Sequence, residues 1–165
     1  MTTRMTAIAI VNTDLPAPTA TALNALHDAE HSGCFACGAP DVGPGLGLRF
    51  CLSTGSTDVA AEWRPPVWAA GYGGTVHGGL IATVLDSAMV HALFARGLLA
   101  RTADLHIRYR HLVLPAAPCR LAARLLRVRG AVFELEATLH QAGRLCARAT
   151  SRFMQAPGLA GPSSL

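Results

Sequence analysis

The chain has 165 residues, of which 51% are hydrophobic and 15% charged, and its formal net charge is +4. That length fits one domain with a sizeable core, and the composition excludes an intrinsically disordered chain. The longest nearly apolar stretch, residues 80–95, is interrupted by polar side chains and is too short to span a membrane. Because the N-terminus is also a poor secretory signal, we expect a cytoplasmic protein with no membrane partner.

Arginine supplies all of the positive charge, since the chain has no lysine, and 11 of the 14 arginines follow residue 95. Guanidinium groups suit phosphates, so an anionic ligand such as a nucleotide or coenzyme A is plausible. A biased genome composition together with a solvated sheet face explains the same excess, and for the arginine content alone we favour that explanation. No helix-turn-helix, zinc-finger or aromatic stacking pattern accompanies these arginines, so we expect no nucleic-acid partner.

Residues 1–33 predict an N-terminal extension ahead of the main domain. Residues 1–20 are rich in Thr, Ala and Pro and are expected to be loosely ordered, in part disordered. Residues 21–31 place Leu23, Leu26 and Ala29 on one side, which predicts a short helix.

Five cysteines, an odd number in a chain expected to be cytoplasmic, argue against a disulfide framework. Cys34 and Cys37 follow His27 and His31 with the spacing H-x3-H-x2-C-x2-C, and zinc prefers these ligand types. The set is more compressed than a zinc finger with its long middle spacer. We therefore favour a buried cysteine pair in a turn and expect no metal, with a zinc site as the alternative.

The main domain is expected over residues 34–155, followed by a flexible tail over residues 156–165. Residues 46–53 and 58–65 predict two strands joined by a hairpin at "TGST", and the glycine-rich segment after them predicts a loop. A helix is predicted over residues 78–96, with Gly97 as its C-terminal cap. It is apolar on nearly every side, so we expect it to be buried.

Four more strands are predicted after this helix, over residues 100–113, 118–130, 131–143 and 144–155. In the first of them, alternation places Leu105, Ile107 and Tyr109 on one face and Thr102 on the other. The second slips phase, which suggests a bulge. One apolar helix among these strands predicts an α+β fold, in which a curved antiparallel sheet of five to six strands wraps around one long buried central helix.

The stretch "GYGGTVHGGLIATVLD", residues 71–86, joins a glycine-rich turn to the apolar helix. Gly78, and with it Gly79, would begin the helix, where free N–H groups suit the oxyanion that forms when a bound carbonyl is attacked. His77 either shapes the turn or hydrogen-bonds nearby. Asp86 lies about 12 Å further along the helix axis, too far to act on the same carbonyl, so such a site needs a second chain. Burial would make its carboxylate more basic than a free one.

The element order and the segments "CFACG…GPGLGLRF", "GYGGTVHGGLIATVLDSAM" and "TADLHIRYRHLV" resemble the hotdog fold, specifically its phenylacetyl-CoA-thioesterase-like branch and a subgroup with a CxxCG element. The resemblance covers residues 34–155. It implies a homodimer or homotetramer that hydrolyses acyl-CoA thioesters without a metal or other cofactor, at sites between subunits. It also implies that Asp86 is the general base or nucleophile and that Thr102 positions water or the carboxylate.

Some candidate residues depart from this resemblance or have plainer explanations. Several relatives carry Asn or Gln where this chain has Gly71, so either backbone groups of the loop contact the substrate instead or the activity is weak or altered. Asp86 has a second explanation as a hydrogen-bonded core group or dimer contact. Arg108 and Arg110, which close the strand after the helix, are the candidates for binding the coenzyme A phosphates. His91 is expected to be an ordinary helix residue with its hydrogen bonds satisfied.

The main hypothesis is therefore an acyl-CoA thioesterase. One alternative is a non-catalytic hotdog domain that binds acyl-CoA or an acyl carrier for regulation or scaffolding. A hotdog dehydratase or hydratase is the other, and it ranks last because those enzymes pair a catalytic histidine with an acid at a different spacing.

Overall fold

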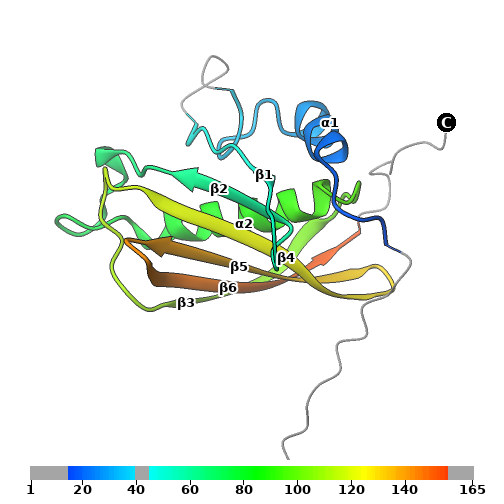
Figure 1. Cartoon of the computed structure of the whole chain (residues 1–165). Coiled ribbons are helices and arrows are strands. Elements are labelled where there is room, and N and C mark those ends of the chain that lie inside the picture. Colours follow the sequence, from blue (N-terminus) through cyan, green and yellow to red (C-terminus); the bar gives the residue numbers. More distant parts are fainter. Residues whose placement is uncertain (1–14, 40–44, 156–165) are drawn as a thin grey trace, which may run out of the picture.

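The computed structural model describes residues 15–39 and 45–155. Six strands of this part form one antiparallel sheet in the order β1-β2-β4-β5-β6-β3. The strands are β1 (Cys51–Leu52), β2 (Val59–Trp63), β3 (Arg101–Tyr109), β4 (Cys119–Arg129), β5 (Val132–Gln141) and β6 (Arg144–Met154). The long helix α2 (Gly78–Phe94) contacts five of them, β2 to β6, so the sheet wraps around the helix as the sequence predicts (Figure 1).

The helix α2 is buried because its side chains are apolar around most of its circumference. Most of its residues from Ile81 onward belong to the core, and the inward face of the sheet packs on them. Its end matches the predicted cap: Gly97 has a φ of +70° and donates to the Phe94 carbonyl at 2.9 Å, while Leu98 donates to the Leu93 carbonyl at 3.0 Å. These paired bonds form a Schellman motif, which favours glycine at the left-handed position.

An ion pair fixes the C-terminal end of α2 to the sheet. Arg96 donates to Asp58 at 2.8 Å, and the two side chains are only 17% and 11% exposed. Asp58 also accepts a hydrogen bond from the Leu125 N–H at 2.8 Å, beside the bulge that the structure places between Leu125 and Arg127 of β4. The phase slip seen in the sequence is therefore a real bulge, confirmed by the register.

Two sequence predictions about strands are wrong in detail. The first strand, expected over residues 46–53, pairs only at Cys51–Leu52, because the N–H groups of Leu46 and Leu48 donate to the backbone of residues 35 and 36 instead. In β3, simple alternation predicted that Thr102 lies on the face of the strand opposite to the one that carries Leu105 and Ile107. A register shift between Thr102 and Asp104 reverses this, since Thr102 now pairs with the buried Phe153 and faces α2.

A second helix, α1 (Ala20–Glu30), lies against α2 (Figure 1). The Thr19 hydroxyl accepts from the Ala22 N–H at its start, and the Thr19 N–H donates to the Ala95 carbonyl at 2.7 Å. Leu23 of α1 is 2% exposed and joins the core. A short 3₁₀ helix, η1 (Val67–Ala69), interrupts the predicted loop. Of the expected loose segments, residues 1–14 and the tail 156–165 lie outside the described residues.

No helix among the described residues is both long enough and apolar enough to cross a membrane.

Candidate active site

The turn that leads into α2 is organised by His77. The ring Nδ1 of His77 accepts a hydrogen bond from the Gly79 N–H at 2.9 Å, so the side chain caps the helix. The backbone N–H of His77 donates to the Ala69 carbonyl at 2.8 Å. An accepting Nδ1 carries no proton, which places the proton of the neutral ring on Nε2. Of the two roles expected for His77, the geometry supports the shaping of the turn.

Gly78 presents the one N–H of this first turn that remains available. The next three N–H groups are bonded to His77, whereas the Gly78 N–H has no acceptor among the residues that the structure describes. The Gly78 carbonyl accepts from the Tyr109 hydroxyl at 2.9 Å. A free N–H at the positive end of a helix is suited to hold an oxyanion.

A pocket of about 450 Å³ opens beside this turn. It is lined by Tyr72, Thr75, Val76, Gly78, Ile81, Tyr109, Arg110, His111, Leu112 and Val113. Most of these side chains are apolar, and Arg110 stands among the few polar ones. Such a lining suits an acyl or aryl chain, with the free Gly78 N–H at its wall.

The space available for a side chain differs among Gly71, Gly78 and Gly79. A Cβ at Gly71 would lie 3.1 Å from the His77 Cα, and one at Gly79 would lie 3.0 Å from His77 Nδ1. Both positions are therefore closely packed on the capping histidine. A Cβ at Gly78 would meet only the Tyr109 ring at 3.7 Å, an ordinary contact. The missing amide at Gly71 is thus explained by packing, since this turn leaves little space for a side chain.

Asp86 and Thr102 come together, from α2 and β3. The Thr102 hydroxyl donates to Asp86 Oδ1 at 2.8 Å. Burial raises the pKa of the Asp86 carboxyl, and the Thr102 hydrogen bond and the nearby His31 partly oppose that shift. The bulge in β3 makes this pair possible, because it turns Thr102 toward the helix. The pair provides a carboxylate that is more basic than usual and held in one orientation.

The two parts of the candidate site are separated within one chain. Asp86 follows Gly78 by eight residues along α2, which corresponds to about 12 Å at the helical rise. Neither Asp86 nor Thr102 lines the pocket beside Gly78. The structure therefore does not bring the carboxylate and the free N–H together in a single chain.

The arginines of the last strands divide into paired and unpaired ones. Arg148 donates to Glu136, and Arg152 donates to Asp104, across the outer face of the sheet. Arg144 Nη2 lies 3.1 Å from His111 Nδ1. Arg108 and Arg110 are exposed, and no ion pair involves them within the described residues. Both line a shallow pocket of about 270 Å³ on the outer face, with His106, Glu136, Arg148 and Thr150. Of the two, only Arg110 also reaches the pocket beside Gly78.

The candidate zinc residues form two overlapping groups. The ligand atoms of His31, Cys34 and Cys37 all lie within 4.8 Å of one another, and so do those of His27, Cys37 and His91. The expectation that His91 is a satisfied helix residue is wrong. Its Nδ1 lies 2.7 Å from the Ser87 carbonyl, but its buried Nε2 has no partner among the described residues.

Sequence reasoning missed Tyr109, whose hydroxyl fixes the Gly78 carbonyl. A signal was present, since alternation along β3 placed Tyr109 on the same face as Leu105 and Ile107, toward the helix. What alternation could not give is the position along the helix that this side chain reaches.

Comparisons with known proteins agree with this architecture. Residues 73–147 match the family model described as the thioesterase superfamily. No match was found among curated protein sequences. Thioesterase superfamily member 2 of zebrafish is 20% identical, with a TM-score of 0.65, over 81% of this chain and 98% of its own.

Two bacterial structures are similar in the same way. A phenylacetic acid degradation-related protein of Ralstonia eutropha is 24% identical, with a TM-score of 0.60, over 70% of this chain and 90% of its own. A Streptococcus mutans protein, solved with acetyl-CoA bound, is 18% identical, with a TM-score of 0.61, over 66% of this chain and 88% of its own. These matches confirm that the chain has the hotdog fold. The subgroup with the CxxCG element stays a prediction.

Proposed function

We propose that this chain, which has the hotdog fold and matches the thioesterase superfamily across its centre, hydrolyses an acyl-CoA thioester as a homodimer or a larger homo-oligomer. The observation that carries the proposal is the Asp86–Thr102 pair: a half-buried carboxylate with a raised pKa, oriented by a hydroxyl at 2.8 Å, on the helix whose first turn leaves the Gly78 N–H free. The acetyl-CoA bound in the Streptococcus mutans structure supports the substrate class.

The shared site follows from the separation of Gly78 and Asp86. With about 12 Å between them on one helix, Asp86 of one chain acts on a carbonyl held at Gly78 of the partner subunit. Two features support such a contact. β3 is an edge strand, so its outer backbone groups are free to meet a second chain. Two large side chains that line the pocket are also exposed, Tyr72 at 91% and Leu112 at 74%.

The chemistry needs one water molecule and no other cofactor. As general base, the Asp86 carboxylate takes a proton from water while the water oxygen bonds to the thioester carbonyl carbon. The oxyanion accepts a hydrogen bond from the partner's Gly78 N–H. Collapse of the tetrahedral intermediate breaks the C–S bond, and the departing thiolate takes the proton from Asp86. As nucleophile, Asp86 would itself bond to the carbonyl carbon, expel the thiolate and form an anhydride that water then cleaves.

Asp86→Asn is the direct test. We expect it to lower kcat by about 100-fold or more, which corresponds to about 2.7 kcal/mol, because an amide neither accepts the proton nor attacks. Released thiol would be measured over a panel of short, medium, long and aryl acyl-CoAs, with the parent chain and an Asp28→Asn variant as controls, since Asp28 is exposed on α1. An Asn variant with the parent rate on the best substrate would leave the carboxylate as a structural group.

The same panel separates the two roles of Asp86. In a single turnover in ¹⁸O-labelled water, a general base places the label only in the product acid. A nucleophile leaves label in the Asp86 carboxylate when water attacks the anhydride at the Asp86 carbonyl, and the bridging oxygen of Asp86 then leaves in an unlabelled product acid. Mass spectrometry of the peptide that contains Asp86 reads this out.

The second candidate function is a non-catalytic acyl-CoA-binding domain, and Gly71 favours it. The amide that several relatives carry here is absent, and a Cβ added at this position would lie 3.1 Å from the His77 Cα, which leaves little space for such a side chain. Tight acyl-CoA binding by calorimetry without turnover of any member of the panel would establish this alternative over hydrolysis.

A further inference from the structure

We propose that His31, Cys34, Cys37 and His91 bind one zinc ion, which joins α1 and the following turn to the middle of α2. The zinc proposal does not rest on the thioesterase proposal. It differs from the zinc site considered from the sequence in one donor, because His91 takes the place of His27.

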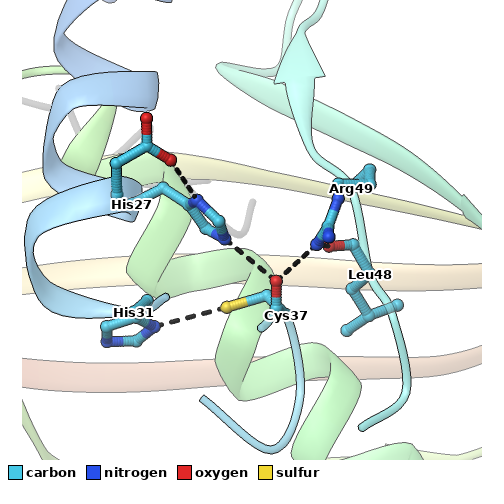
Figure 2. Close-up of polar contacts among 6 residues, drawn as sticks. His27, His31, Cys37, Leu48 and Arg49 are labelled. Atoms are coloured by element: carbon cyan, nitrogen blue, oxygen red, sulfur yellow. Dashed lines mark hydrogen bonds and ion pairs between the residues drawn. The ribbon is translucent and has the colours of Figure 1, made fainter. Parts of the chain in front are cut away.

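The cysteine turn already has the shape of a metal-binding loop. The Gly38 N–H donates to the Cys34 carbonyl at 2.7 Å, and a Cβ at Gly38 would lie 2.5 Å from that oxygen, so only glycine allows this closure. The turn brings both thiols and His31 together, with all ligand atoms within 4.8 Å of one another. His31 Nδ1 lies 3.4 Å from Cys37 Sγ (Figure 2). In a tetrahedral zinc site the corresponding nitrogen–sulfur separation is about 3.6 Å.

His91 offers the fourth donor from α2. It is 2% exposed, and a carbonyl can only accept, so the 2.7 Å contact with the Ser87 carbonyl places the ring proton on Nδ1. Nε2 then carries a free lone pair, is buried, and has no partner within the described part of the chain. A ring nitrogen of His91 lies within 4.8 Å of Cys37 Sγ, the atom that both groups of candidate ligands share, and the ring centroids of His91 and His31 lie 6.0 Å apart, so the four donors close on one ion by a small movement of side chains. A histidine that ligates a metal typically donates its other N–H to a backbone carbonyl in this way.

His27 fits the site less well than His91. Both of its ring nitrogens are engaged: Nδ1 lies 3.1 Å from the Asp28 carboxylate, and Nε2 lies 2.9 Å from the Cys37 carbonyl (Figure 2). That carbonyl also accepts from Arg49. His27 and Arg49 therefore hold the backbone of the cysteine turn, and binding a metal would require His27 to give up one of these bonds.

The buried surroundings suit a neutral zinc complex. Cys37 is 0% exposed and His91 is 2% exposed. Two thiolates and two neutral imidazoles balance the charge of Zn²⁺, which suits a site where the Phe50 ring stacks on His91 at 4.3 Å. Thiolate and imidazole donors in a tetrahedral set favour zinc over harder cations.

The test begins with the unmodified full chain, purified under reducing conditions from zinc-containing medium. Elemental analysis should find about one zinc ion per chain. Titration of the metal-stripped chain with Co²⁺ should give thiolate-to-cobalt charge-transfer bands and the d–d bands of a tetrahedral site. Only background metal, no such bands, or a Cys34–Cys37 disulfide in the freshly purified chain would overturn the proposal.

Single variants then identify the donors. Cys34→Ser, Cys37→Ser and His91→Gln should each weaken zinc binding by about 100-fold or more, since losing only an outer-shell partner already costs up to about that factor. Cys51→Ser, at an exposed cysteine in β1, and His27→Ala are the matched controls and should retain the ion. Full zinc in His91→Gln, or its loss in His27→Ala but not in His91→Gln, would refute this donor set even if the chain binds zinc.

Discussion

Thr102→Val removes the hydroxyl that orients Asp86 and keeps nearly the same side-chain shape. The lost bond stabilises the ionised carboxylate, so its removal raises the pKa of Asp86 further. A hydrogen bond to a charged group is worth about 1.5–3 kcal/mol, and we take the lower value because Thr102 is solvent-exposed. About 1.4 kcal/mol is a factor of ten, so kcat/KM on the acid side of the pH profile should fall by roughly tenfold.

The shape of the profile distinguishes this effect from simple damage to the site. The fall should be smaller at high pH, where Asp86 is ionised in both enzymes, and the acid limb should move to higher pH. Thr102→Ser, which retains a hydroxyl, should stay close to the parent enzyme. A uniform loss at every pH, or a limb that moves to lower pH, would show that Thr102 does not act through the ionisation of Asp86.

Three further predictions concern stability, assembly and the coenzyme. Burial raises the pKa of Asp86 in the folded chain, so its carboxyl favours folding below the unfolded pKa and loses that contribution as the pH rises through the folded pKa. Asp86→Asn should therefore have a higher melting temperature than the parent near pH 7. In calorimetry, the difference between the two melting temperatures should shrink as the pH is lowered. Chains carrying Asp86→Asn and chains carrying Gly78→Phe, each inactive alone, should regain part of the activity when refolded together, and no recovery would argue against a shared site. Arg108→Ala and Arg110→Ala should raise KM for acyl-CoA by about tenfold with little change in kcat and little effect on a pantetheine thioester, whereas equal losses on both substrates would assign these residues to the fold or the dimer.

The parts of the site that depend on local sequence could be predicted. The start of α2 at Gly78 and the glycine cap at Gly97 follow from residues within one turn of each terminus, and both agree with the structure, although the helix ends at Phe94, two residues earlier than predicted. The buried character of α2 follows from its composition alone. Asp86 was singled out because it is a lone carboxylate in an apolar helix that begins with His-Gly-Gly, and the structure gives it a hydrogen-bond partner in Thr102.

The parts that depend on contacts between distant segments could not be predicted. Alternation placed Thr102 on the outer face of β3, and one extra residue between Thr102 and Asp104 was enough to reverse it. The short β1 has a similar cause, because the backbone before it bonds to the cysteine turn at residues 35 and 36 instead of to a strand. The bulge in β4 left a phase slip in the sequence, but neither the bulge in β3 nor the competing loop before β1 left such a mark.

The polar side chains inside α2 follow one rule, although only one of them was assigned a function from the sequence. A polar group in a helix that is covered on all sides lowers the stability of the fold unless it forms a hydrogen bond or binds a metal. We therefore expect each such group to have a partner from another segment. Asp86 receives the Thr102 hydroxyl, whereas His91 has only the Ser87 carbonyl of its own helix and keeps Nε2 unpaired. The cost of an unpaired polar group in a buried helix therefore applies to His91. The cysteine turn places the Cys37 thiol within 4.8 Å of a His91 ring nitrogen, so a zinc ion held by that turn would supply the partner that His91 Nε2 lacks.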